Sequence, residues 1–334
     1  MTGLRAVVDR SARLEIHHVG QIPKWFARLA EKFEARVSRI EPFGEGPARY
    51  CNKLQQLERL SDLDSDIFIL SDADILFLSS PSEWFQTGAV RAKIVDRANP
   101  PGDILQSLLD QAGFSSQSLN CSPEFDPNSR THRLNCNGGL YILNKDHLKK
   151  LCDPWKKWAR YCLGQGELLG SKLYHADQLG FMLAMLELEL PFEPLPAEAN
   201  FSAHYGPSRY DGRTIDSIST LHYHGRVDRE GLLLTTGAPE VDAYIKLANH
   251  VLLNQFGPSI APDAKQEIAA TRRRLGFASW RRRRAREIWS AAIYSDLLFP
   301  LRQTLKTAKR GAKAIRSVTT IGAWSGATKR SQAT

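Results

Sequence analysis

The stretch SDIFILSDADILFLSS, residues 65–80, decides how the rest of the chain is interpreted. Residues 67–70 form a short apolar run with β-branched members and polar borders, which is typical of a buried strand in a parallel sheet. Asp72 and Asp74 follow two residues apart, so an extended backbone would point both carboxylates to the same side. At the carboxyl end of a strand they would repel each other unless a cation such as Mg²⁺ or Mn²⁺ lay between them. The alternative is an Asp-rich turn, because the Asp-x-Asp spacing alone is short and common.

The basic charge of the chain is concentrated at its C-terminal end. Residues 264–334 hold 17 of the 45 Lys and Arg residues but 3 of the 36 acidic ones. The positive formal charge of +9 therefore comes from this tail. A hydrophobic content of 42% and a charged content of 24% are ordinary for a globular protein. We therefore expect an α/β domain over residues 1–262 and a basic extension over residues 263–334.

Cysteine usage and hydropathy indicate a cytoplasmic protein. The five cysteines are odd in number and include no Cys-x-x-Cys pair, so neither a disulfide framework nor a zinc site is expected. The first residues carry charges where a signal peptide needs an apolar core. No apolar run approaches the roughly 18–20 residues of a membrane span.

Strands and helices alternate along the first part of the chain. We expect strands over residues 14–19 and 35–40 and helices over residues 25–33 and 53–63. This order is typical of βαβ units with a mostly parallel sheet, whose ligands bind at the carboxyl ends of the strands. Residues 96–134 are rich in Pro, Ser, Asn and Gln, which predicts a long active-site loop or lid.

Two further segments place polar or small residues where a strand or helix begins. In NCNGGLYILN, residues 135–144, Gly138 and Gly139 let the backbone approach a ligand closely, although a plain turn explains them equally well. Asp177 falls in the first turn of an expected helix, where it either belongs to a site or only complements the helix dipole.

The segment TLHYHG, residues 220–225, ends an expected strand with two histidines. A single histidine is more often structural than a ligand. His222 and His224, however, occur in a chain that already offers paired carboxylates, so the pair favours metal binding.

Taken in order, these segments resemble the GT-A-fold glycosyltransferases, most closely the family 8-like enzymes that use nucleotide-sugar donors. The resemblance covers about residues 14–230 and rests on four motifs in the family's order: Asp72-Ala73-Asp74, residues 137–144, Asp177-Gln178 and His222-Tyr223-His224-Gly225. It implies a GT-A fold, in which a Rossmann-like, mostly parallel sheet is flanked by helices. It also implies a hexosyltransferase with Mn²⁺ or Mg²⁺ as cofactor and a nucleotide sugar, foremost a UDP-sugar, as donor.

The resemblance also implies roles for individual residues. The implied metal ligands are Asp72, Asp74 and His222, with His222 rather than His224 completing the site. The implied donor-binding residues are Lys53, Asp72, Asn137, Gly138, Gly139 and Arg226, and the implied catalytic residues are Asp177 and Gln178.

Two features depart from the family pattern. After its His-x-x-Gly segment the family has a Lys-Pro-Trp that reaches the diphosphate, and Arg226 stands there in this chain, followed by Val227 and Asp228. The family's first strand also has no room before Leu14. We expect that strand to lie upstream of Met1 or to be missing.

The basic tail has the pattern of an amphipathic helix. After Pro300 its apolar positions are Leu301, Leu305, Ala308, Ala312 and Ile315, and its basic positions are Arg302, Lys306, Lys309, Arg310, Lys313 and Arg316. Such a helix suits the anionic inner face of a membrane. A solvated tail and a nucleic-acid-binding tail are the alternatives, although the tail has no recognisable nucleic-acid reader.

The expected function is transfer of a sugar from a nucleotide-sugar donor to a cell-envelope glycan or lipid-linked acceptor, as in polysaccharide biosynthesis. Retention at the anomeric carbon is implied by the resemblance alone. The alternatives are a nucleotide-sugar hydrolase or nucleotidyltransferase on the same fold, and an inactive relative that acts as a membrane-binding adaptor through its tail.

Overall fold

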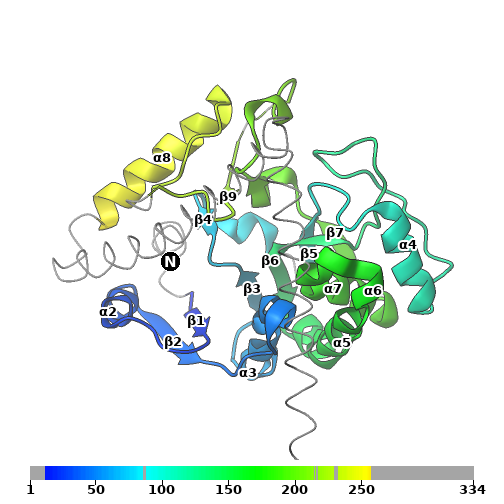
Figure 1. Ribbon diagram of the computed structural model, residues 1–334. Helices are drawn as coiled ribbons and strands as arrows, with labels where there is room; N and C mark the ends of the chain where they lie inside the picture. The colour runs from blue at the N-terminus through cyan, green and yellow to red at the C-terminus, as the bar shows by residue number, and fades with distance from the viewer. Residues whose placement is uncertain (1–11, 86–87, 214, 216, 229–231, 257–334) are drawn as a thin grey trace, which may run out of the picture. The chain divides into compact units, whose positions relative to one another are not determined.

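The computed structural model describes residues 12–85, 88–213, 215, 217–228 and 232–256 (Figure 1). The chain divides into two compact units, Met1–Ala264 and Lys265–Thr334, and all described residues belong to the first. The expected amphipathic tail lies outside the described residues. The expectation about a first strand stays a prediction, because the structure describes nothing before residue 12.

The described unit is a mixed α/β fold, which confirms the expected class. The strands are β1 (Leu14–His18), β2 (Ala35–Arg39), β3 (Ile67–Ser71), β4 (Ile75–Phe77), β5 (Val90–Ile94), β6 (Cys136–Asn144), β7 (Phe192–Pro194), β8 (Phe201–Ser202) and β9 (Thr220–His222). The α-helices are α2 (Lys24–Lys32), α3 (Leu57–Ser61), α4 (Gly102–Gln111), α5 (Lys145–Gly164), α6 (Gly166–Leu169), α7 (Ala176–Leu188) and α8 (Pro239–Phe256). Short 3₁₀ helices are η1 (Gly46–Gln56), η2 (Pro81–Trp84), η3 (Gly170–His175), η4 (Ala197–Asn200) and η5 (Pro207–Arg209).

The strands form three hydrogen-bonded sheets. The largest has the order β3-β6-β5-β7, a second has the order β4-β9-β8, and β1 pairs with β2. β6 runs antiparallel to both β3 and β5, whereas β5–β7, β8–β9 and β1–β2 are parallel pairs. The order of the elements in the sequence had predicted mostly parallel pairing around the central strand. An apolar run records burial on both faces but not strand direction, so the sequence did not reveal these antiparallel pairs.

β6 is buried on both faces, and its side chains enter two different hydrophobic clusters. Tyr141 and Leu143 pack in the cluster that contains Trp155 of α5. Leu140 and Ile142, which alternate with them, belong to a second cluster. Because successive side chains of a strand point to opposite faces, a strand covered on both sides has a continuous apolar sequence. β3 follows the same rule, which explains the apolar run at residues 67–70.

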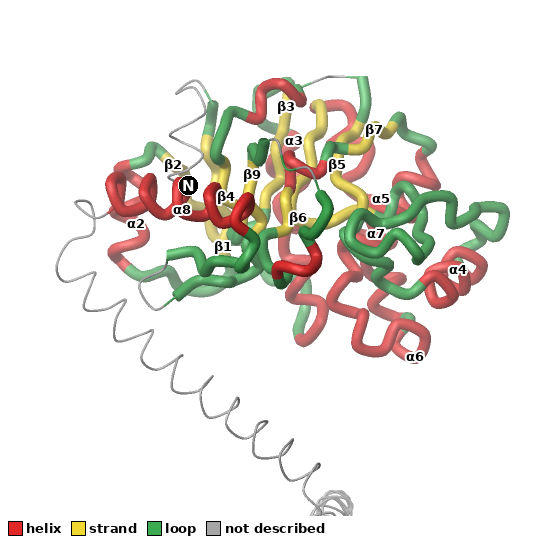
Figure 2. The backbone as a smooth tube through the Cα atoms, turned by 90° about the horizontal axis from the view of Figure 1, so that it is seen from above, coloured by secondary structure: helices red, strands yellow, loops and turns green. Residues whose placement is uncertain are grey.

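The helices α5 and α7 lie side by side next to this sheet (Figures 1 and 2). A Cβ atom at Gly180 would lie 2.6 Å from the backbone nitrogen of Ala159, so only glycine permits this approach. Trp155 Nε1 donates a hydrogen bond to the backbone oxygen of Asp177 at 2.7 Å. The packing of α5 therefore positions the first turn of α7, where two of the predicted site residues lie.

Other local expectations hold in part. The helix expected over residues 53–63 begins as the 3₁₀ helix η1 and becomes α-helical only at Leu57. The long connection over residues 96–134 is present, with α4 as its helical part. None of the described helices combines the length and the apolar character that a bilayer span requires. All five cysteines are free thiols.

Candidate active site

Lys53 joins two of the predicted site carboxylates. Its Nζ lies 2.7 Å from Asp72 Oδ1 and 3.1 Å from Asp177 Oδ2, and it donates to the backbone oxygen of Gly138 at 2.7 Å. Lys53 comes from η1, Asp72 follows β3, and Asp177 lies in the first turn of α7. One ammonium group from η1 therefore contacts three other segments that are far apart in the sequence: the end of β3, β6 and the first turn of α7.

Burial shapes the charges of this group. Burial alone would lower the pKa of Lys53, but the charges of Asp72 and Asp177 outweigh it and raise the pKa above its ordinary value. Burial raises the pKa of Asp177, and the neighbouring Lys53 offsets this only in part. The lysine is thus held as a cation, and it compensates two carboxylates that would otherwise repel each other.

The two glycines of β6 make room for side chains from other segments. A Cβ atom at Gly138 would lie 3.0 Å from Gln178 Cγ and 3.3 Å from Asp177 Oδ2. A Cβ atom at Gly139 would lie 2.5 Å from Cε1 of the His222 ring. Neither contact is compatible with a larger residue unless the neighbour moves. Close packing within the site therefore favours the glycine pair, most strongly at Gly139, whereas the sequence had left a plain turn as an equal explanation.

Asp74 lies beside two histidines at the end of β9. Its Oδ1 is 3.4 Å from His222 Nε2, and one ligand atom from each of Asp74, His222 and His224 falls within 4.8 Å of the others. The rings of His222 and His224 are stacked, with centroids 3.6 Å apart and an angle of 17° between their planes. His224 adopts a left-handed backbone conformation, with φ of 46°.

A positive charge fits this position. A carboxylate oxygen that faces an imidazole nitrogen needs a proton or a metal ion between them. Burial alone would raise the pKa of Asp74, but the hydrogen bond and charge of His222, followed by the charge of His224, lower it. Oxygen and imidazole ligands suit Mn²⁺, and Mg²⁺ accepts the carboxylate. The donor set is thus compatible with the divalent ion that the sequence motifs predict.

Asp72 and Asp74 have different partners in the structure. Their spacing in the sequence had predicted an extended backbone that points both carboxylates to one side. Residues 73 and 74 instead form a turn between β3 and β4, so Asp72 contacts Lys53 while Asp74 faces His222. Asp72 is not part of the three-residue group around Asp74, whereas His224, which the family pattern left out, is part of it.

The other two predicted residues, Asn137 and Arg226, have different surroundings. Asn137 lies in the site, where its Oδ1 accepts a hydrogen bond from the Gly139 N–H at 2.9 Å. Arg226 instead donates to the backbone oxygens of His204 at 2.9 Å and Thr235 at 3.1 Å. Its guanidinium therefore connects two loop segments.

Sequence reasoning missed two buried residues next to Asn137. Asp96 accepts from the Asn137 amide at 2.9 Å, and Asn200 lies 3.0 Å from His222 Nδ1. Asp96 follows β5, in which Arg91 and Lys93 interrupt the apolar residues, so it lacks the continuous apolar run that singled out Asp72. Asn200 follows a Pro-rich connection and carries no comparable signal in the sequence.

Comparison with known proteins gives neighbours in structure only. No family model matches the sequence, and no curated protein matches it significantly. Mouse xyloside xylosyltransferase 1 in its apo form is similar with a TM-score of 0.43 and 13% identity, over 67% of this chain and 89% of that one. An active-site mutant of LgtC gives a TM-score of 0.43 and 14% identity, over 74% of this chain and 89% of that one.

The glycosyltransferase GlyE of Streptococcus pneumoniae TIGR4 is a third neighbour, with a TM-score of 0.42 and 13% identity, over 78% of this chain and 60% of that one. By name, the first of these proteins is a xylosyltransferase and the third is a glycosyltransferase. All three TM-scores lie below 0.5, so the function proposed below rests on the residues of this chain.

Proposed function

We propose that the protein is a metal-dependent glycosyltransferase. It would move a sugar from a nucleotide-sugar donor, foremost a UDP-sugar, to a cell-envelope glycan or lipid-linked acceptor, with retention at the anomeric carbon. The ion would be Mn²⁺ or Mg²⁺, held by Asp74 and His222 with Asp72 or His224 as a further ligand.

The adjacency of Gly138 and Gly139 carries this proposal. The first glycine faces Asp177 and Gln178, and the second faces His222. Groups suited to holding a sugar and groups suited to holding a divalent ion therefore meet over two consecutive residues of β6. A nucleotide sugar needs both, because its sugar and its diphosphate are joined by the bond that breaks.

The residues of the site have different roles in this proposed reaction. In this proposal the carboxylate of Asp177 stabilises the positive charge that develops on the sugar ring, and Gln178 orients the sugar hydroxyls. Lys53 keeps Asp177 close to Asp72 without repulsion and attracts the negatively charged donor. A divalent ion bound at Asp74 and His222 would neutralise the charge that develops on the leaving diphosphate.

Calorimetric titration of Mn²⁺ with a panel of nucleoside diphosphates tests this function. We expect metal-dependent binding of one nucleotide to the wild type, and a loss of more than about 100-fold in affinity for Asp74→Ala, because the variant lacks a charged ligand. Nucleotide binding that is equal with and without Mn²⁺, or equal in the two proteins, would contradict the proposed site.

Asp153→Ala is the matched control. Glu58, Cys152 and Asp153 form the other three-residue group that could hold a metal among the described residues. It lies on α3 and α5, and Glu58 is paired with Lys156 at 2.7 Å. We expect Asp153→Ala to bind Mn²⁺ and nucleotide like the wild type. Equal losses in both variants would indicate nonspecific metal binding.

The membrane acceptor is a separate part of the proposal, and the basic composition of residues 264–334 supports it. We expect the full chain to sediment with anionic vesicles and a chain without these residues to stay in solution. Sedimentation that does not depend on these residues would remove this part and leave the donor site untouched.

A further inference from the structure

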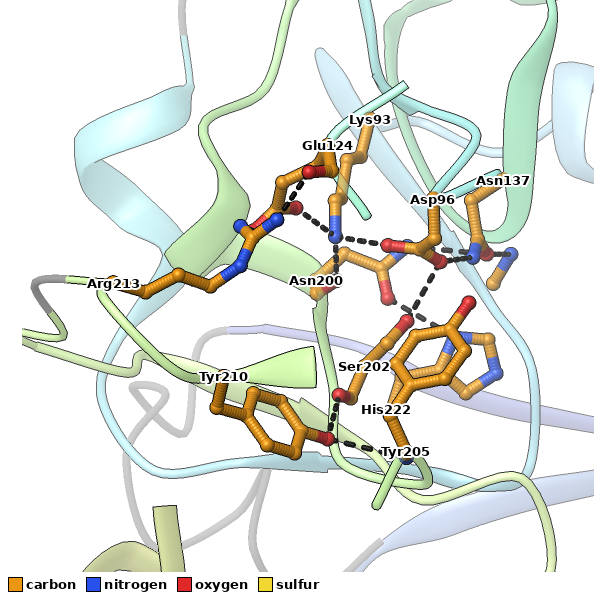
Figure 3. Close-up of polar contacts among 11 residues, drawn as sticks. Lys93, Asp96, Glu124, Asn137, Asn200, Ser202, Tyr205, Tyr210, Arg213 and His222 are labelled. Carbon is orange, nitrogen blue, oxygen red and sulfur yellow. Dashed lines mark hydrogen bonds and ion pairs between the residues drawn. The ribbon is translucent and has the colours of Figure 1, made fainter. Parts of the chain in front are cut away.

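A chain of buried hydrogen bonds leads from His222 to a carboxylate on the far side of Asn137 (Figure 3). Its members are Asp96 after β5, Asn137 in β6, Asn200 at the end of η4 and His222 at the end of β9. Each link joins one donor to one acceptor. Once the donor and the acceptor of one hydrogen bond are known, the donors and acceptors of the other bonds follow.

The direction is set at Asn137. The backbone N–H of Gly139 can only donate, and it lies 2.9 Å from Asn137 Oδ1. The amide nitrogen of Asn137 points the other way and donates to Asp96 Oδ2 at 2.9 Å. An ionised carboxylate can only accept, so both partners require the same orientation of the Asn137 amide.

Asp96 is held in its ionised form. Burial alone would raise the pKa of its carboxyl. The ammonium of Lys93, 2.5 Å away, outweighs that effect together with hydrogen bonds from Ser202 and Asn137, and lowers the pKa. Lys93 is itself buried and lies 2.9 Å from Glu124 Oε2 on its other side (Figure 3). The far end of the chain is thus a stable acceptor at neutral pH.

The orientation of the Asn137 amide determines the orientation of the Asn200 amide, which in turn faces His222. Asn137 Oδ1 also accepts from Asn200 Nδ2 at 3.4 Å, so Asn200 Oδ1 lies on the opposite side of that amide. This oxygen is 3.0 Å from His222 Nδ1. Because an amide oxygen can only accept, Nδ1 must carry the hydrogen. When a metal ion lies between Nε2 and Asp74 Oδ1, the ring is neutral and its lone pair is on Nε2.

We propose that Asn200 is a positioning residue that holds His222 in the tautomer with its hydrogen on Nδ1, so that the lone pair of Nε2 is directed at an ion shared with Asp74. The use of that lone pair rests on the proposed function, whereas the tautomer does not. A free histidine side chain in water prefers the opposite tautomer, so the hydrogen bond to Asn200 supplies the selection. Partners of this kind orient metal-binding histidines and strengthen them as ligands.

The tautomer can be measured directly by multiple-bond proton–nitrogen NMR on histidine-labelled, metal-free protein at alkaline pH, where free imidazole is neutral. His222→Gln assigns the signal among the 9 histidines. We expect Nδ1 of His222 to carry a hydrogen in the wild type, also where Nε2 shares a proton with Asp74. A wild-type ring without a hydrogen on Nδ1 would overturn the inference, and this result requires no variant of Asn200 to fold.

Variants then test whether Asn200 is responsible. Asn200→Ala is expected to move His222 toward the tautomer with hydrogen on Nε2 and to weaken Mn²⁺ binding about 10–100-fold. Asn135→Ala is the matched control, because Asn135 is equally buried but its amide donates to Asn99 and Thr131 instead. We expect Asn135→Ala to retain the wild-type tautomer and Mn²⁺ affinity.

The outcomes separate this inference from the proposed function. A wild type with hydrogen on Nδ1 that binds no Mn²⁺ would reject the metal site and support the tautomer assignment. A wild type and an Asn200→Ala protein with equal Mn²⁺ affinity and the same tautomer would overturn the positioning role, even where the metal site itself is real.

Discussion

Gly180 lies in the helical region, formed by α5 and α7, and Gly139 lies in the strand region, formed by β6 and β9. Both glycines admit a close neighbour, but the neighbours differ in kind. At Gly180 the neighbour is the backbone of Ala159, and the surroundings of α5 and α7 are apolar. At Gly139 the neighbour is the ring of His222, which belongs to a chain of polar contacts. The helices are thus held by close apolar packing, whereas the residues around Gly139 and His222 are held by directional hydrogen bonds.

The difference has a physical consequence for each region. Apolar packing is not directional, so many apolar side chains of similar volume can serve in the helical region. Hydrogen bonds inside the strand region are directional, and the loss of one partner leaves a buried polar group without a substitute. We therefore expect substitutions in the helical region to change mainly stability, and those in the strand region to change mainly ligand binding.

Lys53→Met tests the place where the two regions meet, and it has the largest expected effect. It leaves the buried Asp177 carboxylate without its cation, which is expected to lower the free energy of unfolding by about 3–5 kcal/mol, while the partly exposed Asp72 adds little. Urea denaturation followed by circular dichroism measures the change.

Lys157→Met is the control for that prediction. Lys157 is exposed and pairs with Glu187 at 2.6 Å on the surface of the helical region. An exposed pair of this kind contributes about 0–1 kcal/mol. Equal losses in the two variants would show that the two site carboxylates do not depend on Lys53.

Gly180→Ala and Gly139→Ala compare the two regions directly, with a smaller expected effect. The Gly180→Ala methyl group collides with backbone, so we expect a loss of about 1–3 kcal/mol in stability and unchanged Mn²⁺ affinity in the folded protein. The Gly139→Ala methyl group collides with the His222 ring, so we expect a loss of at least about 10-fold in Mn²⁺ affinity. Denaturation and calorimetry on each variant separate the two effects.

Gly164→Ala is the control for both glycines, because a Cβ atom there meets nothing within 4 Å. We expect it to match the wild type within about 0.5 kcal/mol and to bind Mn²⁺ normally. If Gly180→Ala weakened Mn²⁺ binding as strongly as Gly139→Ala, the distinction between the two regions would be wrong.

The apolar pattern of the sequence was enough to predict much of the scaffold. The run at residues 67–70 became β3, the strands expected over residues 14–19 and 35–40 became β1 and β2, and the helix expected to hold Asp177 in its first turn became α7. These predictions succeeded because burial on one or both faces of an element leaves a local periodic record in the chain.

The sequence by itself also singled out Asp74, Asp177 and His222, because each is a polar residue next to a strand or helix end. Only the tertiary structure decided their partners: Asp72 contacts Lys53, Asp74 faces His222, and Asn200 orients the histidine ring. It also decided that β6 runs antiparallel to both of its neighbours. The physical reason is range. The burial of an element is visible in the apolar pattern of a few neighbouring residues. The partner of a charge or an amide, in contrast, comes from a segment that it meets only when the chain folds.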